Sequence, residues 1–387
     1  MKNLSLPLYS LVALLLSIEF AGAHAELKNE VLHLEEYRRP TARRILQIPD
    51  IDGFQTLKCD LHMHTVFSDG LVWPTLRIEE AWEEGLDAIS ITDHVEYQPH
   101  KRDIPSNHNR AYQVARKKAG EANIILIKGS ELTRATPPGH FNAIFNGDAS
   151  VYPEDNEKNN LERDKLAIAL AADQGSFIFW NHPGWKADTI EGSYEWLPFV
   201  DDLLREGKLH GIEVVNSFYF YPKALDWALE HDLTILGTSD IHHFISSKYD
   251  MERGATRSMS LIFAKDRSAE GIREALEAGR SVAWSTKLLA GKEKWVRALY
   301  EASVSVAPVH ETNKKGTTYR TISNTSDLHF VLKRADEKLE GWPEQIDLLP
   351  QSSQILAIKP ASENGSAQYT VTNAYIGGSE TLVVELP

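Results

Sequence analysis

The sequence predicts a (β/α) barrel followed by a small β-sandwich. Between residues 55 and 288, short apolar runs alternate with helix-length segments about seven times, which suits a barrel better than an open sheet. The runs are continuously apolar, which is typical of parallel strands covered by helices. After about residue 290, short strand-like runs with turn residues between them replace the helical periodicity, which favours a β-sandwich.

The barrel elements follow one another in a regular order. The first strand, 56–61, leads to a helix that begins at Pro74, whose fixed φ suits a first helical position, and that Gly85 can end. The further predicted strands are 88–92, 123–128, 141–145, 176–180, 211–215, 234–237, 259–264 and 282–284, and the further helices are 109–122, 161–174, 222–231 and 269–278. The sandwich strands are 317–322, 329–332, 355–358, 369–372 and 381–385. We therefore predict a lead-in segment (26–54), a barrel (55–288) and a β-sandwich (289–387) without a catalytic cluster.

Residues 1–25 predict a secretory signal peptide. Lys2 provides the positive end, 11–16 form the apolar centre, and Ala23-His-Ala25 is a small-x-small cleavage site. A membrane anchor is the alternative, but the apolar stretch is short and Glu19 interrupts it. No other stretch is apolar enough to span a bilayer. We expect a periplasmic or secreted protein that begins at Glu26 and has no stable membrane insertion after cleavage.

The charge balance argues against a nucleic-acid partner. The chain has 41 Lys and Arg residues against 55 Asp and Glu residues, a formal charge of −14, and no long basic run. This balance also argues against binding to an anionic membrane. It does not exclude a small phosphorylated substrate, because bound metal ions reverse the local field.

Residues that can bind metals follow the predicted barrel strands. His62 and His64 are two apart at the end of the first strand, so both side chains point to the same face, and Asp69 lies in a turn before Gly70. Further candidates lie at the ends of later strands: His94 after Asp93, Glu131, His140, His182, Asp240 and His242. Taken alone, each could be a turn residue, a cap or a solvated carboxylate. Their joint placement at strand ends, where barrel enzymes build their sites, indicates a metal centre.

These motifs resemble those of the polymerase and histidinol phosphatase (PHP) family, metal-dependent phosphoesterases with a distorted (β/α)7 barrel. The family pattern is His-x-His with Asp, then Thr-Asp-His, Glu, His, a His before Pro, and Asp-x-His. All nine positions have a counterpart within residues 55–285: His62, His64, Asp69, His94, Glu131, His140, His182, Asp240 and His242. The resemblance implies two or three divalent ions. The first would be held by His62, His64, Glu131 and Asp240, the second by Glu131, His140 and His182, and the third by Asp69, His94 and His242. Such mixed ligands suit manganese, zinc or iron.

The resemblance also implies phosphate-ester hydrolysis by a metal-bridging hydroxide, with Asp93, His94 and Asp240 as catalytic residues. Asp93 is expected to orient a histidine rather than bind metal. Three divalent ions outweigh three ligand carboxylates, so the pocket would attract an anionic phosphate.

Four residues are candidates for substrate contact. Arg134, Arg253 and Arg257 follow the ligand motifs and could clamp phosphate oxygens, although most arginines are surface residues. Tyr219 lies near a strand end and could contact the organic group, although core packing explains it equally well.

Aromatic residues in the loops near the strand ends and the predicted export favour organic phosphodiesters. The layout is similar to an exported bacterial phosphodiesterase branch of the family that has an appended β-domain. Two alternatives stay open: a phosphomonoesterase of the histidinol phosphatase type, and a protein that binds metal or ligand without turnover. We expect a small organic phosphate ester as the partner and no nucleic acid. The sequence leaves the oligomeric state open.

Overall fold

The computed structural model describes residues 42–51, 53–105, 107–133, 139–154, 160–185, 194–336, 338–360 and 366–387. The predicted signal peptide lies outside the described residues, as does most of the lead-in segment. Residues 42–50 of that segment are irregular rather than helical. In the described part of the chain, no helix has the length and apolar character needed to cross a membrane.

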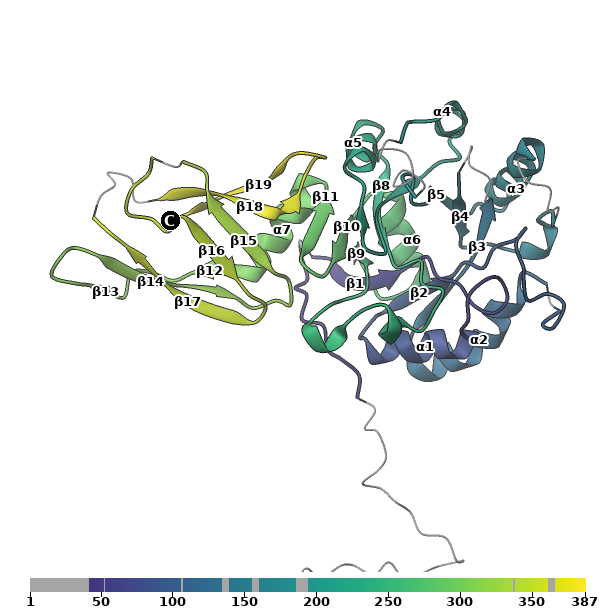
Figure 1. Cartoon of the computed structure of the whole chain (residues 1–387), viewed down its shortest axis with the longest axis horizontal. Coiled ribbons are helices and arrows are strands. Elements are labelled where there is room, and N and C mark those ends of the chain that lie inside the picture. The colour runs from purple at the N-terminus through teal and green to yellow at the C-terminus, as the bar shows by residue number, and fades with distance from the viewer. Residues whose placement is uncertain are drawn as a thin grey trace, which may run out of the picture. The chain divides into compact units, whose positions relative to one another are not determined.

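The larger part of the chain is a barrel of strands surrounded by helices (Figure 1). The strand order is β10-β9-β1-β2-β3-β4-β5-β6-β8. The barrel strands are β1 (Gln55–Asp60), β2 (Ala88–Ile91), β3 (Ile125–Thr133), β4 (Phe141–Ile144), β5 (Phe177–Trp180), β6 (Gly211–Asn216), β8 (Thr234–Thr238), β9 (Met259–Ala264) and β10 (Ser281–Ser285). The helices are α1 (Pro74–Glu83), α2 (Arg110–Ala122), α3 (Leu161–Asp173), α4 (Pro198–Arg205), α5 (Pro222–Glu230) and α6 (Ala269–Glu277). The predicted α/β barrel is thus confirmed.

The sheet is mixed rather than parallel throughout, which corrects one expectation. Strands β1, β2 and β3 are parallel, as are β5, β6 and β8, whereas β4 is antiparallel to both of its neighbours. Strand β9 is antiparallel to β1 and β10. The connection from β3 to β4 gives a physical reason: no α-helix lies between these strands among the described residues, and a parallel return needs a longer crossover segment.

Side chains close the barrel where β8 meets β9. The Ser260 hydroxyl accepts a hydrogen bond from Gly237 N at 3.0 Å and donates one to Gly237 O at 2.9 Å. A Cβ at Gly237 would lie 2.6 Å from the Met259 carbonyl oxygen. Glycine is therefore required here by the close approach of two strands.

The C-terminal part consists of two antiparallel sheets. One contains β12 (Val304–Val306), β13 (Glu311–Thr312), β14 (Thr318–Asn324) and β17 (Ser352–Ile358), and the other contains β15 (Phe330–Arg334), β16 (Gln345–Leu348), β18 (Ala367–Tyr375) and β19 (Thr381–Leu386). Buried Ile322, Phe330 and Tyr369 belong to its core. Strand β18 also pairs with β11 (Leu288–Gly291), which pairs with β10, so one sheet continues from the barrel into the sandwich.

Helix α7 (Glu293–Ser303) lies where the sequence predicted no helix. Its buried side chains Trp295, Val296, Leu299 and Tyr300 lie on one face, a helical spacing that was overlooked in the predicted β-region. Trp295 packs edge-on against Phe54, with ring centroids 6.0 Å apart, and Tyr300 contacts Phe330 at 5.3 Å. The helix therefore contacts both parts of the chain, and the domain boundary at residue 289 stays a prediction.

Candidate metal centre

The strand ends bring the nine predicted ligands together at one edge of the barrel. His62 and His64 follow β1, His94 follows β2, Glu131 lies in β3, and His182 follows β5. His140 precedes β4, which runs antiparallel, so its amino end lies at this same edge. Backbone hydrogen bonds connect the ligand loops: Asp240 N donates to His62 O at 2.9 Å and His64 N donates to Ile241 O at 3.0 Å.

The first predicted group is closely packed, and three of its four side chains are buried. His62 Nε2 and His64 Nε2 are 3.1 Å apart, as expected for two side chains on the same face. Asp240 Oδ1 lies 3.2 Å from His62 Nε2 and 3.1 Å from His64 Nε2. Glu131 Oε2 lies 3.4 and 3.3 Å from the same two nitrogens. Four potential donors thus face one small volume.

The second predicted group shares Glu131 with the first. Glu131 Oε1 lies 2.9 Å from His140 Nδ1 and 3.9 Å from His182 Nε2. Asn181 Nδ2 donates to the same oxygen at 2.8 Å and fixes the carboxylate. His182 has a φ of 23°, a strained value for a residue with a side chain, and such strain is often concentrated at functional sites.

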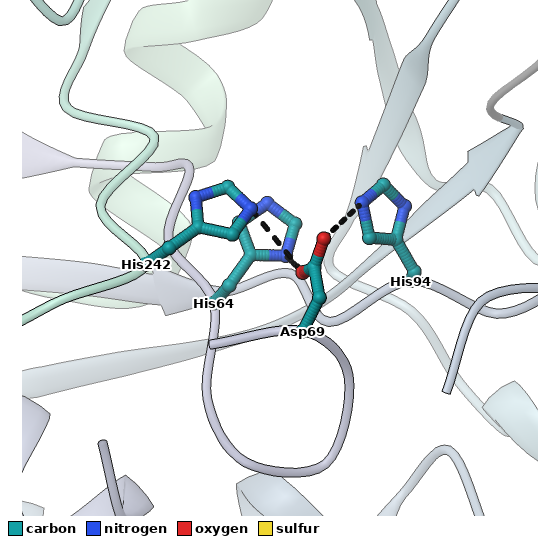
Figure 2. A group of neighbouring side chains, drawn as sticks. All are labelled: His64, Asp69, His94 and His242. Carbon is teal, nitrogen blue, oxygen red and sulfur yellow. Dashed lines mark ion pairs between the residues drawn. The ribbon is translucent and has the colours of Figure 1, made fainter. Parts of the chain in front are cut away.

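The third predicted group lies on the more exposed side. Figure 2 shows the Asp69 carboxylate between His94 and the rings of His64 and His242. Asp69 Oδ1 is 3.2 Å from His242 Nε2, and Asp69 Oδ2 is 3.7 Å from His94 Nε2. The His64 and His242 rings stack with centroids 4.1 Å apart. His64 thus lies within reach of this group as well as the first, which the predicted division did not include.

The electrostatics of the cluster keep its carboxylates ionised. Burial opposes ionisation, but the neighbouring histidines outweigh it and hold the pKa values of Asp69, Glu131 and Asp240 below their usual range. Burial lowers the pKa of His94 to about 3 and that of His182 to about 4. Burial also opposes charging of His64, yet hydrogen bonds with Asp240 and Glu131 raise its pKa to about 10. Metal ions require anionic oxygens and neutral imidazoles, so the carboxylates, His94 and His182 are already in the ligand form, whereas His64 would have to lose a proton when metal binds.

Asp93 supports His64 through an intervening hydroxyl. Its carboxylate accepts hydrogen bonds from Thr65 N and Thr65 Oγ1, both at 2.6 Å, and from Ser68 Oγ at 2.7 Å. Since the Ser68 proton is directed to Asp93, the hydroxyl can accept from His64 Nδ1, 3.2 Å away. Asp93 therefore holds the loop between His64 and Asp69, and its assignment as a catalytic residue stays a prediction.

The structure contradicts a phosphate-binding role for Arg257. Its side chain is fully buried. It donates to both carboxylate oxygens of Glu84, at 2.8 and 2.6 Å, and to Asp60 Oδ2 at 3.1 Å. These contacts use the hydrogen-bond donors of the guanidinium group. Arg257 therefore stabilises the barrel by pairing with buried carboxylates and is not available to bind phosphate.

The other substrate candidates have different outcomes. Arg253 ends a short 3-10 helix (Met251–Arg253), and its exposed side chain pairs with Asp250. Tyr219 lies in β7 (Tyr219–Phe220) and is 55% exposed, as a substrate contact requires. Arg134 lies outside the described residues. Substrate contact by Arg134, Arg253 and Tyr219 stays a prediction.

Two buried residues at the site escaped the sequence analysis. Glu213 in β6 lies 2.7 Å from His62 Nδ1 and, with His62 and His182, forms a further group of potential ligands. Arg77 in α1 donates to the carbonyl oxygens of His64, Ile241 and His243 at 2.8–3.0 Å. A charged residue inside the apolar run of β6 was the available sign for Glu213.

Comparisons with known proteins show which family the chain resembles. The PHP domain profile matches residues 60–179, and an Ig-like domain profile matches residues 304–387. A two-domain protein from Bacteroides vulgatus containing a predicted PHP-like metal-dependent phosphoesterase is 41% identical, with a TM-score of 0.83. The match covers 90% of this chain and 99% of that one. The chain belongs to the PHP family.

Two more distant structures were also matched. A proposed metal-dependent phosphoesterase from Bifidobacterium adolescentis is 18% identical over 56% of this chain and 95% of its own, with a TM-score of 0.38. PsfC from Pseudomonas syringae is 16% identical over 64% of this chain and 96% of its own, with a TM-score of 0.40. No curated protein gives a significant match.

The residues of this PHP centre fit bound metal ions. His94 Nδ1 and His140 Nε2 are buried and lack a hydrogen-bond partner among the described residues. A buried polar atom without a partner costs roughly 1–3 kcal/mol, so such atoms need another interaction. Coordination of divalent ions by the clustered imidazoles and carboxylates satisfies them.

Gly70 is required by the loop that carries Asp69 in this PHP chain. A Cβ at this position would lie 2.6 Å from His64 C and 2.7 Å from Thr65 N. We expect Gly70→Ala to displace Asp69 or His64 and to weaken manganese binding about 10-fold or more, as measured by equilibrium dialysis. The control is Gly120→Ala in α2, where a Cβ meets nothing within 4 Å. Equal affinity in the two variants would contradict this role for Gly70.

Proposed function

We propose that this protein is a metal-dependent phosphoesterase that hydrolyses small organic phosphodiesters. The convergence of six histidines and three ionised carboxylates at one barrel edge carries the proposal. Membership of the PHP family supports the reaction class. The donor set suits manganese, zinc or iron, and the overlapping ligand groups could hold two or three ions.

The ligand groups would hold the ions as the sequence resemblance implies, with His64 available to two groups. When bound, divalent ions would supply Lewis acidity that lowers the pKa of water and offsets phosphoryl charge. The side chains of His62, His64 and Glu131 are at most 1% exposed, whereas those of Asp69, Asp240 and His242 are 16–30% exposed. Substrate would therefore approach from the side of Asp69 and His242.

Exposed apolar side chains lie near the predicted ligands in the chain or in space. Leu71 and Phe244 lie two residues beyond Asp69 and His242, and both are about half exposed. Trp185 is 47% exposed, and its ring lies 5.4 Å from that of His140 and 5.9 Å from that of His182, between centroids. These exposed apolar side chains suit a phosphodiester, which carries an organic group on each side of a singly charged phosphate. Arg257 is held by Glu84 and Asp60, so it does not offer the charge that would favour the dianion of a phosphomonoester.

The substrate class is tested by two chromogenic esters. Purified, manganese-loaded protein should hydrolyse bis(p-nitrophenyl) phosphate faster than p-nitrophenyl phosphate, and a chelator should stop both reactions. Faster monoester hydrolysis would replace the diesterase proposal with a phosphomonoesterase. Bound metal without turnover of either ester would favour a non-catalytic binding protein.

Trp185 gives a sharper prediction about the organic group. An aromatic stacking contact contributes about 0.5–1.5 kcal/mol, so Trp185→Ala should raise KM for bis(p-nitrophenyl) phosphate roughly 2–10-fold with little change in kcat. Steady-state kinetics measure this split. Trp185→Phe retains a ring and should restore most of the affinity. An unchanged KM in the alanine variant would exclude Trp185 from the substrate site.

We also propose that the protein is exported, on the basis of the signal-like sequence alone. Fractionation of the native host followed by N-terminal sequencing should find the mature chain in the periplasm or medium, beginning at Glu26. A full-length chain in the cytoplasm would contradict export.

A further inference from the structure

Glu213 is a buried carboxylate with no assigned role. It lies in β6, all six residues of which are buried, and its side chain is 0% exposed. Removing a carboxylate from water is costly unless hydrogen bonds or opposite charges compensate. The groups around it therefore indicate what it does.

Four donors surround the two oxygens of Glu213. Oε1 accepts hydrogen bonds from His62 Nδ1 and Thr238 Oγ1, both at 2.7 Å. Oε2 accepts from His182 N at 2.8 Å and from Asn216 Nδ2 at 2.9 Å. With each oxygen already accepting two hydrogen bonds, Glu213 is placed to anchor its neighbours rather than to serve as a tenth metal ligand.

The anchored neighbours are predicted ligands of two different ions. Because His62 donates its Nδ1 proton to Glu213, its Nε2 is left to face His64, Asp240 and Glu131. The bond to His182 N restrains the backbone at the residue with φ of 23°, whose Nε2 lies 3.6 Å from Asp240 Oδ2. One carboxylate thus holds a ring in the first group and a backbone in the second.

We propose that Glu213 is a positioning residue that fixes His62 as an Nε2 ligand and His182 in its strained conformation. This inference rests on the metal centre of the proposed function. Carboxylates that accept from a ligand histidine orient its ring and raise its basicity, and their loss typically costs about 10–100-fold in metal affinity.

Glu213→Gln tests the proposal because it keeps the shape and removes the charge. If the glutamine oxygen faces His182 N, its NH2 group faces His62 Nδ1 and donates a hydrogen bond to it. The His62 proton must then lie on Nε2, and this nitrogen can no longer bind metal. In the opposite orientation the glutamine NH2 group would face the His182 N–H, so two hydrogen-bond donors would point at each other. We expect manganese affinity to fall about 10–100-fold in equilibrium dialysis, and excess manganese to restore binding. Exposed Glu230→Gln in α5 is the matched control and should bind as the wild type does.

The outcomes separate this inference from the proposed activity. Wild-type manganese affinity and stoichiometry in Glu213→Gln would overturn the positioning role even if the enzyme hydrolyses esters. Weakened binding would support it even if no ester were hydrolysed. A second measurement needs no variant: histidine-ring ¹⁵N spectra of the zinc-loaded wild type should show His62 protonated at Nδ1. Protonation at Nε2 would overturn the proposal should Glu213→Gln fail to fold.

Discussion

Asp240→Asn is expected to reduce phosphodiester hydrolysis by about 10³-fold or more. The carboxylate faces the nitrogens of His62 and His64 at 3.1–3.2 Å, and its second oxygen lies 3.6 Å from His182 Nε2. Asparagine keeps the shape but removes the charge that all these groups share. Metal-ion catalysis supplies several kcal/mol, and each ~1.4 kcal/mol is tenfold in rate. The measurements are kcat/KM for bis(p-nitrophenyl) phosphate and metal content per chain.

Asp250→Asn is the control for that variant. Asp250 lies ten residues along the same loop, and its carboxylate is 55% exposed, pairs with the Arg253 side chain at 3.3 Å and accepts a hydrogen bond from Arg253 N that asparagine can also accept. Activity should stay within about twofold of wild type. If Asp240→Asn retains more than about a tenth of wild-type activity, the catalytic centre lies elsewhere.

Arg257→Met is expected to destabilise the protein by about 3–5 kcal/mol, because it leaves Glu84 and Asp60 as buried charges without their partner. The same arrangement explains why Arg257 cannot reach a substrate. Urea denaturation of the metal-loaded variant measures the change in the free energy of unfolding.

Arg253→Met should change that free energy by less than about 0.5 kcal/mol, since its ion pair is exposed. The two substitutions remove the same charge from positions four residues apart. The difference between their unfolding free energies therefore measures the effect of burying the arginine and its ion pairs. Wild-type stability in Arg257→Met, together with a raised KM, would restore Arg257 as a substrate residue.

The site could be located from sequence because its residues lie at strand ends. His62, Glu131 and Asp240 are far apart in the chain, yet the carboxyl ends of barrel strands meet at one edge, so a chain-order pattern predicted a spatial cluster. His140 was assigned correctly to this edge only because its strand runs in the opposite direction.

What the sequence could not reveal depends on distant partners. Arg253 and Arg257 have similar positions in the sequence, four residues apart after the Asp-x-His motif. Arg257 belongs to the core because it pairs with Glu84, which is 173 residues away in the chain. Glu213 lacks a motif because three of its four partners, His62, His182 and Thr238, come from other segments of the chain. Helix α7 did have a recognisable apolar face, but the surrounding strand pattern masked it.

The most direct test of the account is anomalous X-ray diffraction from manganese-soaked crystals, with data collected on both sides of the manganese absorption edge. We expect two or three peaks within the cluster, at positions near His62 and His64, near His140 and His182, or near His94 and His242, with Glu131 close to the first two positions. Peaks elsewhere, or none at saturating manganese, would contradict the metal centre on which the proposed hydrolysis depends.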